Sequence, residues 1–125
     1  MAMEVRSRRD GSPATTPVTY SQPTGFAKSD KLRISVRADA SDFTGPGSTH
    51  PAASKVSWTA TATNGTPSNG TLSSTAYTQV YQSGGNLKTT DSGTINLAWT
   101  LASILAPGLR SGVHTLTVRW KFEAF

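Results

Sequence analysis

Residues 115–123 alternate strictly between polar and apolar side chains. The apolar residues all fall on one parity: Leu116, Val118, Trp120 and Phe122. The polar residues fall on the other: Thr115, Thr117, Arg119, Lys121 and Glu123. Because successive side chains of a strand point to opposite faces, this pattern predicts a long strand with one buried and one wet face. Such a strand needs other strands to cover its apolar side, which constrains the whole chain to a β architecture.

Three other segments repeat this alternation, at residues 31–38, 55–63 and 94–101. Weaker strand patterns cover residues 18–21 and 75–82. Proline, glycine and Asn-Gly pairs separate these segments and mark turns. Strands at these spacings, with no helical period of any length, are typical of a sandwich or a barrel.

Three strands carry a tryptophan at an inward position, namely Trp58, Trp99 and Trp120. We expect these rings to form the centre of the core, with at least one indole N–H donating to a carbonyl. The loop at residues 39–51 contains Phe43, which we expect to close the edge of that core.

The chain has 125 residues, of which 35% are hydrophobic. This predicts one domain with a modest core and few apolar residues to line a large cavity. The absence of cysteine excludes disulfides and cysteine metal sites. No apolar run approaches the ~20 residues of a membrane span, and residues 1–21 lack the apolar core of a signal peptide.

The first 17 residues are polar and basic and contain Gly11, Pro13 and Pro17. They are predicted to form a flexible arm without a fold of its own, which could dock onto a neighbouring subunit. Deletion of this arm is expected to leave a folded domain that assembles less well.

Catalytic and metal-binding patterns are lacking. The two histidines are His50, in a Pro/Gly loop, and His114, at the start of the last strand. No serine lies in a nucleophile-elbow pattern. Asp39 and Asp42 share one loop but offer too few oxygen ligands for calcium, and Asp39 and Asp91 fit turn caps better. We therefore expect no enzyme activity, no metal and no cofactor.

The net charge of +5 raises the question of an anionic partner. If the strands at 31–38 and 115–123 are neighbours, their basic residues share an outer face. Single-strand nucleic-acid binders interleave aromatics with basic residues, whereas the strand aromatics here lie on the opposite parity, which disfavours nucleic acid. The candidate partner-binding residues, in the arm and on this face, are Arg6, Arg8, Arg9, Lys31, Arg33, Arg37, Arg119 and Lys121.

Two passages resemble a known kind of domain. The first runs from Leu32-x-Ile34-x-Val36 through Ser41-Asp42-Phe43-Thr44-Gly45 to Pro51-Ala52-Ala53-Ser54-x-Val56-x-Trp58. The second is Leu109-x-x-Gly112-Val113-His114-Thr115-Leu116-Thr117-Val118. They resemble small immunoglobulin-like sandwich domains of bacterial surface and secreted proteins, of the pilin-like or spore-coat-like kind, in which tyrosine is usual where His114 stands. The resemblance covers roughly residues 32–122 and carries over no active-site residues.

The resemblance implies a non-catalytic building block that assembles, adheres or decorates a surface. Together with the residue pattern, it predicts an antiparallel, immunoglobulin-like β-sandwich of about seven strands over residues 18–125, preceded by the arm at 1–17. The expected location is the cell surface or the exterior, or a phage virion, whose decoration and tail proteins need no signal peptide. The expected partners are protein subunits in a homo-oligomer or larger assembly, with an anionic polymer or glycan as the other possibility.

A carbohydrate-binding or adhesion module is the alternative function. It requires at least two aromatics exposed in one plane, and the candidates outside the strong strands are Tyr77, Tyr81, Phe43 and Phe26.

Overall fold

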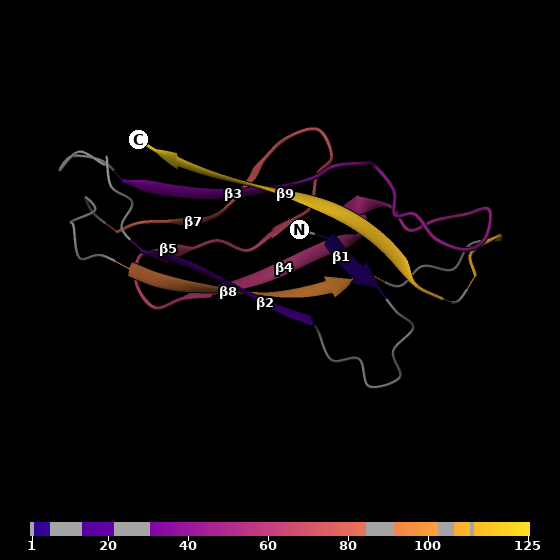
Figure 1. Ribbon diagram of the computed structural model, residues 1–125, viewed down its shortest axis with the longest axis horizontal. Coiled ribbons are helices and arrows are strands. Elements are labelled where there is room, and N and C mark those ends of the chain that lie inside the picture. Colours follow the sequence, from indigo (N-terminus) through magenta and orange to yellow (C-terminus); the bar gives the residue numbers. More distant parts are fainter. Residues whose placement is uncertain (1, 6–13, 22–30, 85–91, 103–106, 111) are drawn as a thin grey trace.

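The computed structural model of the chain describes residues 2–5, 14–21, 31–84, 92–102, 107–110 and 112–125 (Figure 1). Among them it contains one short 3-10 helix, η1 (Ala53–Lys55), and nine strands. The strands are β1 (Ala2–Val5), β2 (Ala14–Ser21), β3 (Leu32–Ala38), β4 (Val56–Ala62), β5 (Thr66–Pro67), β6 (Gly70–Thr71), β7 (Thr78–Gln82), β8 (Ser92–Leu101) and β9 (His114–Ala124). No helix in this part of the chain is both long enough and apolar enough to cross a membrane.

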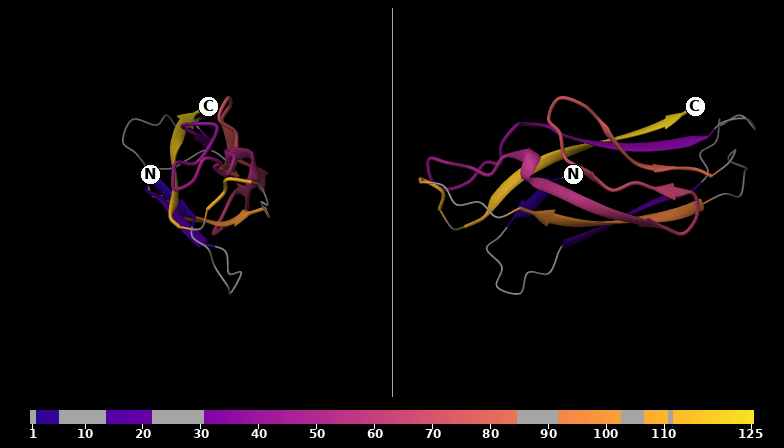
Figure 2. Two further views of the ribbon diagram at one scale, coloured as in Figure 1. Left: turned by 90° about the vertical axis from the view of Figure 1, so that its right-hand side faces the viewer. Right: turned by 180° about the vertical axis from the view of Figure 1, so that it is seen from behind.

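The strands form two sheets, ordered β1-β9-β3-β7-β5 and β2-β8-β4-β6. Every pairing within them is antiparallel. Figure 2 shows the strands of both sheets running along the length of the molecule. The prediction of an antiparallel β-sandwich is confirmed. The expected number was about seven, and the described strands number nine: the six segments predicted above, together with β1 and the two-residue strands β5 and β6.

The strand order departs from the immunoglobulin arrangement at both ends of the chain. In immunoglobulin domains one sheet has the order A-B-E-D, and the other contains C, F and G. In the order β9-β3-β7-β5, β3 corresponds to strand B, and its outer neighbour is β9, the last described strand, where an immunoglobulin domain has strand A. In the order β2-β8-β4, β8 corresponds to strand F, and its outer neighbour is the early strand β2, where an immunoglobulin domain has strand G. The two terminal positions are therefore exchanged in the chain.

The predicted inward residues of the strong strands build the core between the sheets. Leu32, Ile34, Val36 and Ala38 of β3 are all buried, as are Val56 and Trp58 of β4 and Ile95, Leu97 and Trp99 of β8. Ala60, Ala62 and Leu101 pack against this cluster while partly exposed. Alternation therefore predicted the core-facing side of these strands, but Ser35, predicted to face outward from β3, is buried as well.

Two of the three tryptophans occupy the expected central position. The rings of Trp58 and Trp99 meet edge to face, with 5.6 Å between their centroids. The Trp58 indole N–H donates to the carbonyl of Ser68 at 2.8 Å, which confirms the expected bond. Trp120 is only partly buried and packs against the rim of the cluster.

The apolar side of β9 is buried at its beginning and exposed at its end. Leu116 and Val118 are buried, but the Phe122 side chain is 52% exposed, so its predicted burial is wrong. β1 flanks β9 only along residues 114–117. Beyond them β9 forms the margin of its sheet among the described residues, where a side chain has neighbours on one side only.

The N-terminal stretch contributes strands, so the predicted arm is wrong for part of its length. Ala2–Val5 pairs with residues 114–117 of β9, and β2 starts at Ala14 rather than at residue 18. The Trp99 indole N–H donates to the Thr16 hydroxyl at 2.9 Å, which ties β2 to the core. Backbone pairing needs no alternating side chains, so the sequence pattern does not reveal it. Residues 6–13, with Arg6, Arg8 and Arg9, lie outside the described residues.

The loop that follows β3 is anchored on the core and on β9. Phe43 is buried, as predicted. Thr44 and Thr115 exchange two backbone hydrogen bonds, of 2.9 and 2.8 Å. Gly45 then passes close to β9, because a Cβ at this position would lie 2.5 Å from His114 Nδ1 and 2.9 Å from the Val113 carbonyl oxygen.

We predict that Trp58→Phe lowers the free energy of unfolding by about 2 kcal/mol. The variant loses the hydrogen bond to Ser68 and part of a buried ring. Trp120→Phe, at the rim, is expected to cost less than about 1 kcal/mol. Urea unfolding followed by circular dichroism measures both, and equal losses would contradict the assignment of Trp58 to the centre of the core.

Gly45→Ala is expected to destabilise the domain by about 1–3 kcal/mol, because the new methyl group overlaps His114 and the backbone of Val113. Gly84→Ala is the matched control, since its nearest neighbour would lie at an ordinary 3.6 Å. The melting temperatures of the two variants decide the matter. If Gly45→Ala has the same melting temperature as the parent protein, Gly45 is not in close contact with His114 and Val113.

Candidate functional site

The basic residues of β3 and β9 lie on neighbouring strands. In the register of the pair, Arg37 stands opposite Arg119, and Arg33 stands opposite Glu123. The expectation that the two strands are adjacent, with their basic residues on one outer side, is confirmed. We call this surface the basic face, which consists of Lys31, Arg33, Arg37, Arg119 and Lys121.

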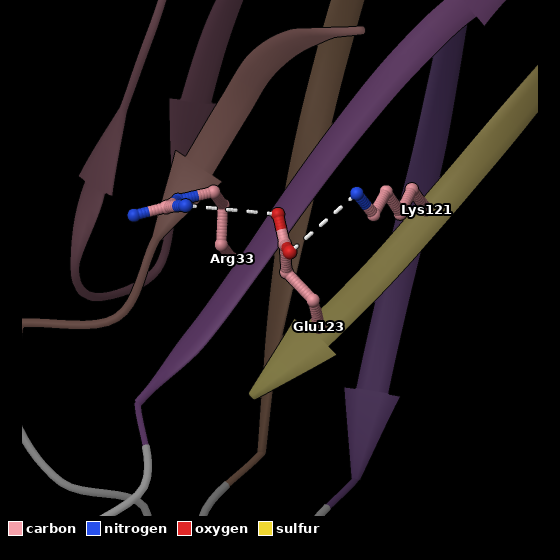
Figure 3. Close-up of polar contacts among 3 residues, drawn as sticks. All are labelled: Arg33, Lys121 and Glu123. Atoms are coloured by element: carbon pink, nitrogen blue, oxygen red, sulfur yellow. Dashed lines mark ion pairs between the residues drawn. The ribbon is translucent and has the colours of Figure 1, made fainter. Parts of the chain in front are cut away.

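Two carboxylates partly neutralise the basic face. Arg119 Nε lies 2.5 Å from Asp39 Oδ1. Glu123 forms ion pairs with Arg33, at 3.7 Å from Nη1 to Oε1, and with Lys121, at 3.6 Å from Nζ to Oε2. Figure 3 shows the two cations on opposite sides of the carboxylate. Five cations against two carboxylates leave three positive charges in excess. Because the paired side chains are 31% to 57% exposed, water screens the pairs, and each pair contributes at most about 1 kcal/mol.

Two aromatic rings also belong to the basic face. The Arg33 guanidinium lies 4.2 Å from the centroid of the Phe125 ring. Tyr77 lies under two cations, Arg37 at 5.3 Å and Lys121 at 5.5 Å. These distances fall within the range of cation–π attraction. Trp120 and Phe122 lie on the opposite parity, but Phe125 and Tyr77 add two rings to the outer face, which the prediction missed.

The two aromatics differ in how far the sequence reveals them. Phe125 shares the parity of Lys121 and Glu123, so extending the alternation by one step would have found it. Tyr77 precedes β7 and reaches the face from outside both basic strands. No local pattern indicates that contact.

Arg37, like Lys31, makes no ion pair among the described residues. Its Nε is buried and has no hydrogen-bond partner among the described residues. Its charge faces the Tyr77 ring rather than a carboxylate. The guanidinium carries its remaining N–H donors on the two terminal nitrogens.

The outer edge of β9 is a second feature of this region. Lys31 and Phe125 exchange backbone hydrogen bonds of 2.9 and 3.0 Å, so the odd-numbered residues of β9 direct their N–H and C=O groups toward β3. The even-numbered residues direct theirs away from it. Trp120, Phe122 and Ala124 thus present backbone donors and acceptors to which no strand of the described chain is paired. We call residues 119–124 on this side the open edge.

The edge of the second sheet at β2 is different. Thr63 N–H donates to the Thr94 carbonyl, so the even-numbered residues of β8 face β4. Pro17 stands opposite Asn96, which places the proline nitrogen on the outer side of β2. A proline there removes a donor from the edge and hinders the addition of another strand.

The two histidines, far apart in sequence, lie side by side. Their rings meet edge to face at 6.0 Å. His114 is buried, and its Nε2 lies 2.8 Å from the Arg110 carbonyl oxygen, so Nε2 carries the hydrogen and donates it. Among the described residues there is no group of three or more His, Cys, Asp or Glu that could hold a metal ion. The pair packs the loop of Phe43 against β9.

We predict that Arg37→Gln and Lys121→Gln weaken retention on a cation-exchange column more than Lys55→Gln does. All three variants remove one positive charge, but Lys55 lies in η1, next to the other sheet. Charges clustered on one face attract an anionic surface together, whereas an isolated one adds little. The salt concentration at elution is the measurement, and identical shifts for the three variants would contradict a dominant basic face.

Comparisons with protein-family models, with curated proteins and with solved structures find no significant match to this chain.

Proposed function

We propose that the protein is a non-catalytic structural subunit or module of a bacterial surface structure or of a phage virion, in the virion as a capsid decoration or tail component. The observation that carries this proposal is the open edge of β9, a row of backbone donors and acceptors beside the half-exposed Phe122. A strand edge of this kind pairs with another chain unless it is covered.

The N-terminal strand supports the same proposal. β1 has four residues, and among the described strands it pairs only with β9. A short strand with one neighbour is the element that a subunit can exchange with another at least cost. The contacts that we propose for assembly are therefore β1, the open edge and the basic face.

A carbohydrate-binding or adhesion module is the alternative. It is favoured by the 39% and 42% exposure of Tyr77 and Phe125 on the same outer face. A sugar would stack on such rings. Cations lie over both rings, however, which suits an anionic ligand or an acidic protein better than a neutral glycan.

We expect light scattering to show an oligomer or an ordered assembly whose size grows with protein concentration. Added salt should change the assembly if the basic face takes part, because salt screens exposed charges. A protein that stays monomeric at every concentration and salt would contradict the proposal and favour the ligand-binding alternative.

Deletion of residues 1–5 is expected to weaken assembly while the sandwich stays folded. This truncation removes β1 but keeps Thr16, which a deletion of residues 1–17 would remove together with its bond to Trp99. Circular dichroism reports the fold and light scattering the assembly. Unchanged assembly would exclude β1 from the subunit contacts.

A further inference from the structure

We propose that the open edge of β9 pairs with the same edge of a second copy, antiparallel and centred on Phe122. This inference rests on the proposed assembly function and names its partner and its register. It is a two-fold symmetric contact, in which one patch of the chain meets itself.

The backbone groups of the open edge match those of a second copy. Trp120, Phe122 and Ala124 direct their N–H and C=O groups outward. In an antiparallel pair centred on Phe122, Trp120 of one copy meets Ala124 of the other, and Phe122 meets Phe122. All the outward groups of these three residues then find partners, and the two sheets join into one.

The charges on the outer side select this register. Lys121 of each copy then stands opposite Glu123 of the other, which gives two pairs of opposite charge on one face. The two neighbouring registers that keep the outward backbone groups paired are centred on residue 121 or residue 123. They place Lys121 opposite Lys121 or Glu123 opposite Glu123, and directly opposed like charges are destabilising.

The apolar side and the position of β1 agree with the same register. The Phe122 side chain, 52% exposed in the single chain, gains its copy as a neighbour across the two-fold axis. β1 covers residues 114–117 of each β9. The pairs considered in this register run from residue 119 opposite residue 125 to residue 125 opposite residue 119, and the stretch that β1 covers lies outside them.

Charge reversal tests the register. K121E places a carboxylate opposite Glu123 of the copy, and E123K places a cation opposite Lys121. Each single variant is expected to raise the dimer dissociation constant at least ~10-fold, since opposed like charges at an interface cost several kcal/mol. The double variant K121E/E123K restores both opposite pairs and is expected to return to within ~3-fold of the parent value. Sedimentation velocity over a range of concentration measures the constants, with K55E as the matched control for net charge.

A cysteine at the axis tests the same contact directly. The chain has no cysteine, so F122C carries one thiol, which faces its own copy across the seam at a Cα separation that a disulfide can span. Mild oxidation is expected to cross-link F122C into a dimer on a non-reducing gel. T71C, on the exposed edge strand β6, is the control that should not cross-link.

The outcomes separate the inference from the proposed function. A parent protein that assembles, but that K121E and E123K do not weaken, overturns the β9 pairing and leaves the assembly function standing. A parent protein that is monomeric at all concentrations overturns both. Rescue by the double variant, with cross-linking of F122C alone, establishes the pairing and its register.

Discussion

The pairing of β3 with β9 is the interaction on which the rest of the molecule depends. Seven residues of each strand stand in register, from Leu32 opposite Ala124 to Ala38 opposite Val118. One side of this ladder supplies Ile34, Val36 and Val118 to the core. The other side gathers the cations of the basic face. The same ladder determines which backbone groups of β9 face inward and which remain on the open edge.

The sequence pattern predicted which face of this strand pair is buried. It did not predict which strands lie beside the pair. Alternation is a local property, so it identified the buried side of β3 and the polar side of β9 correctly. Burial at Phe122 depends on whether another strand lies beside β9, which local alternation cannot report. The strand at Ala2–Val5 was missed for a related reason, because its pairing is made by the backbone and leaves no periodic signal in so short a segment.

Contacts between distant loops were equally hidden. Tyr77 reaches Arg37 and Lys121 only because the turn before β7 passes over the β3–β9 pair. His50 meets His114 only because the Phe43 loop is fastened to β9 at Thr44. All of these residues stood out in the sequence, but their spacing along the chain does not indicate that they are close in space. Their proximity follows from the tertiary structure.

The exchange of the terminal strand positions has a consequence for how the protein folds. The first described strand pairs with the last, with Ala2 opposite Thr117, and β2 pairs with β8. Contacts between residues so far apart in sequence require closure of large loops and slow the folding of a domain. During synthesis, neither the β1–β9 ladder nor the β3–β9 ladder can form until β9 has left the ribosome. Until then β3, which supplies four buried apolar side chains to the core, has one unpaired backbone edge, and the first sheet cannot be completed.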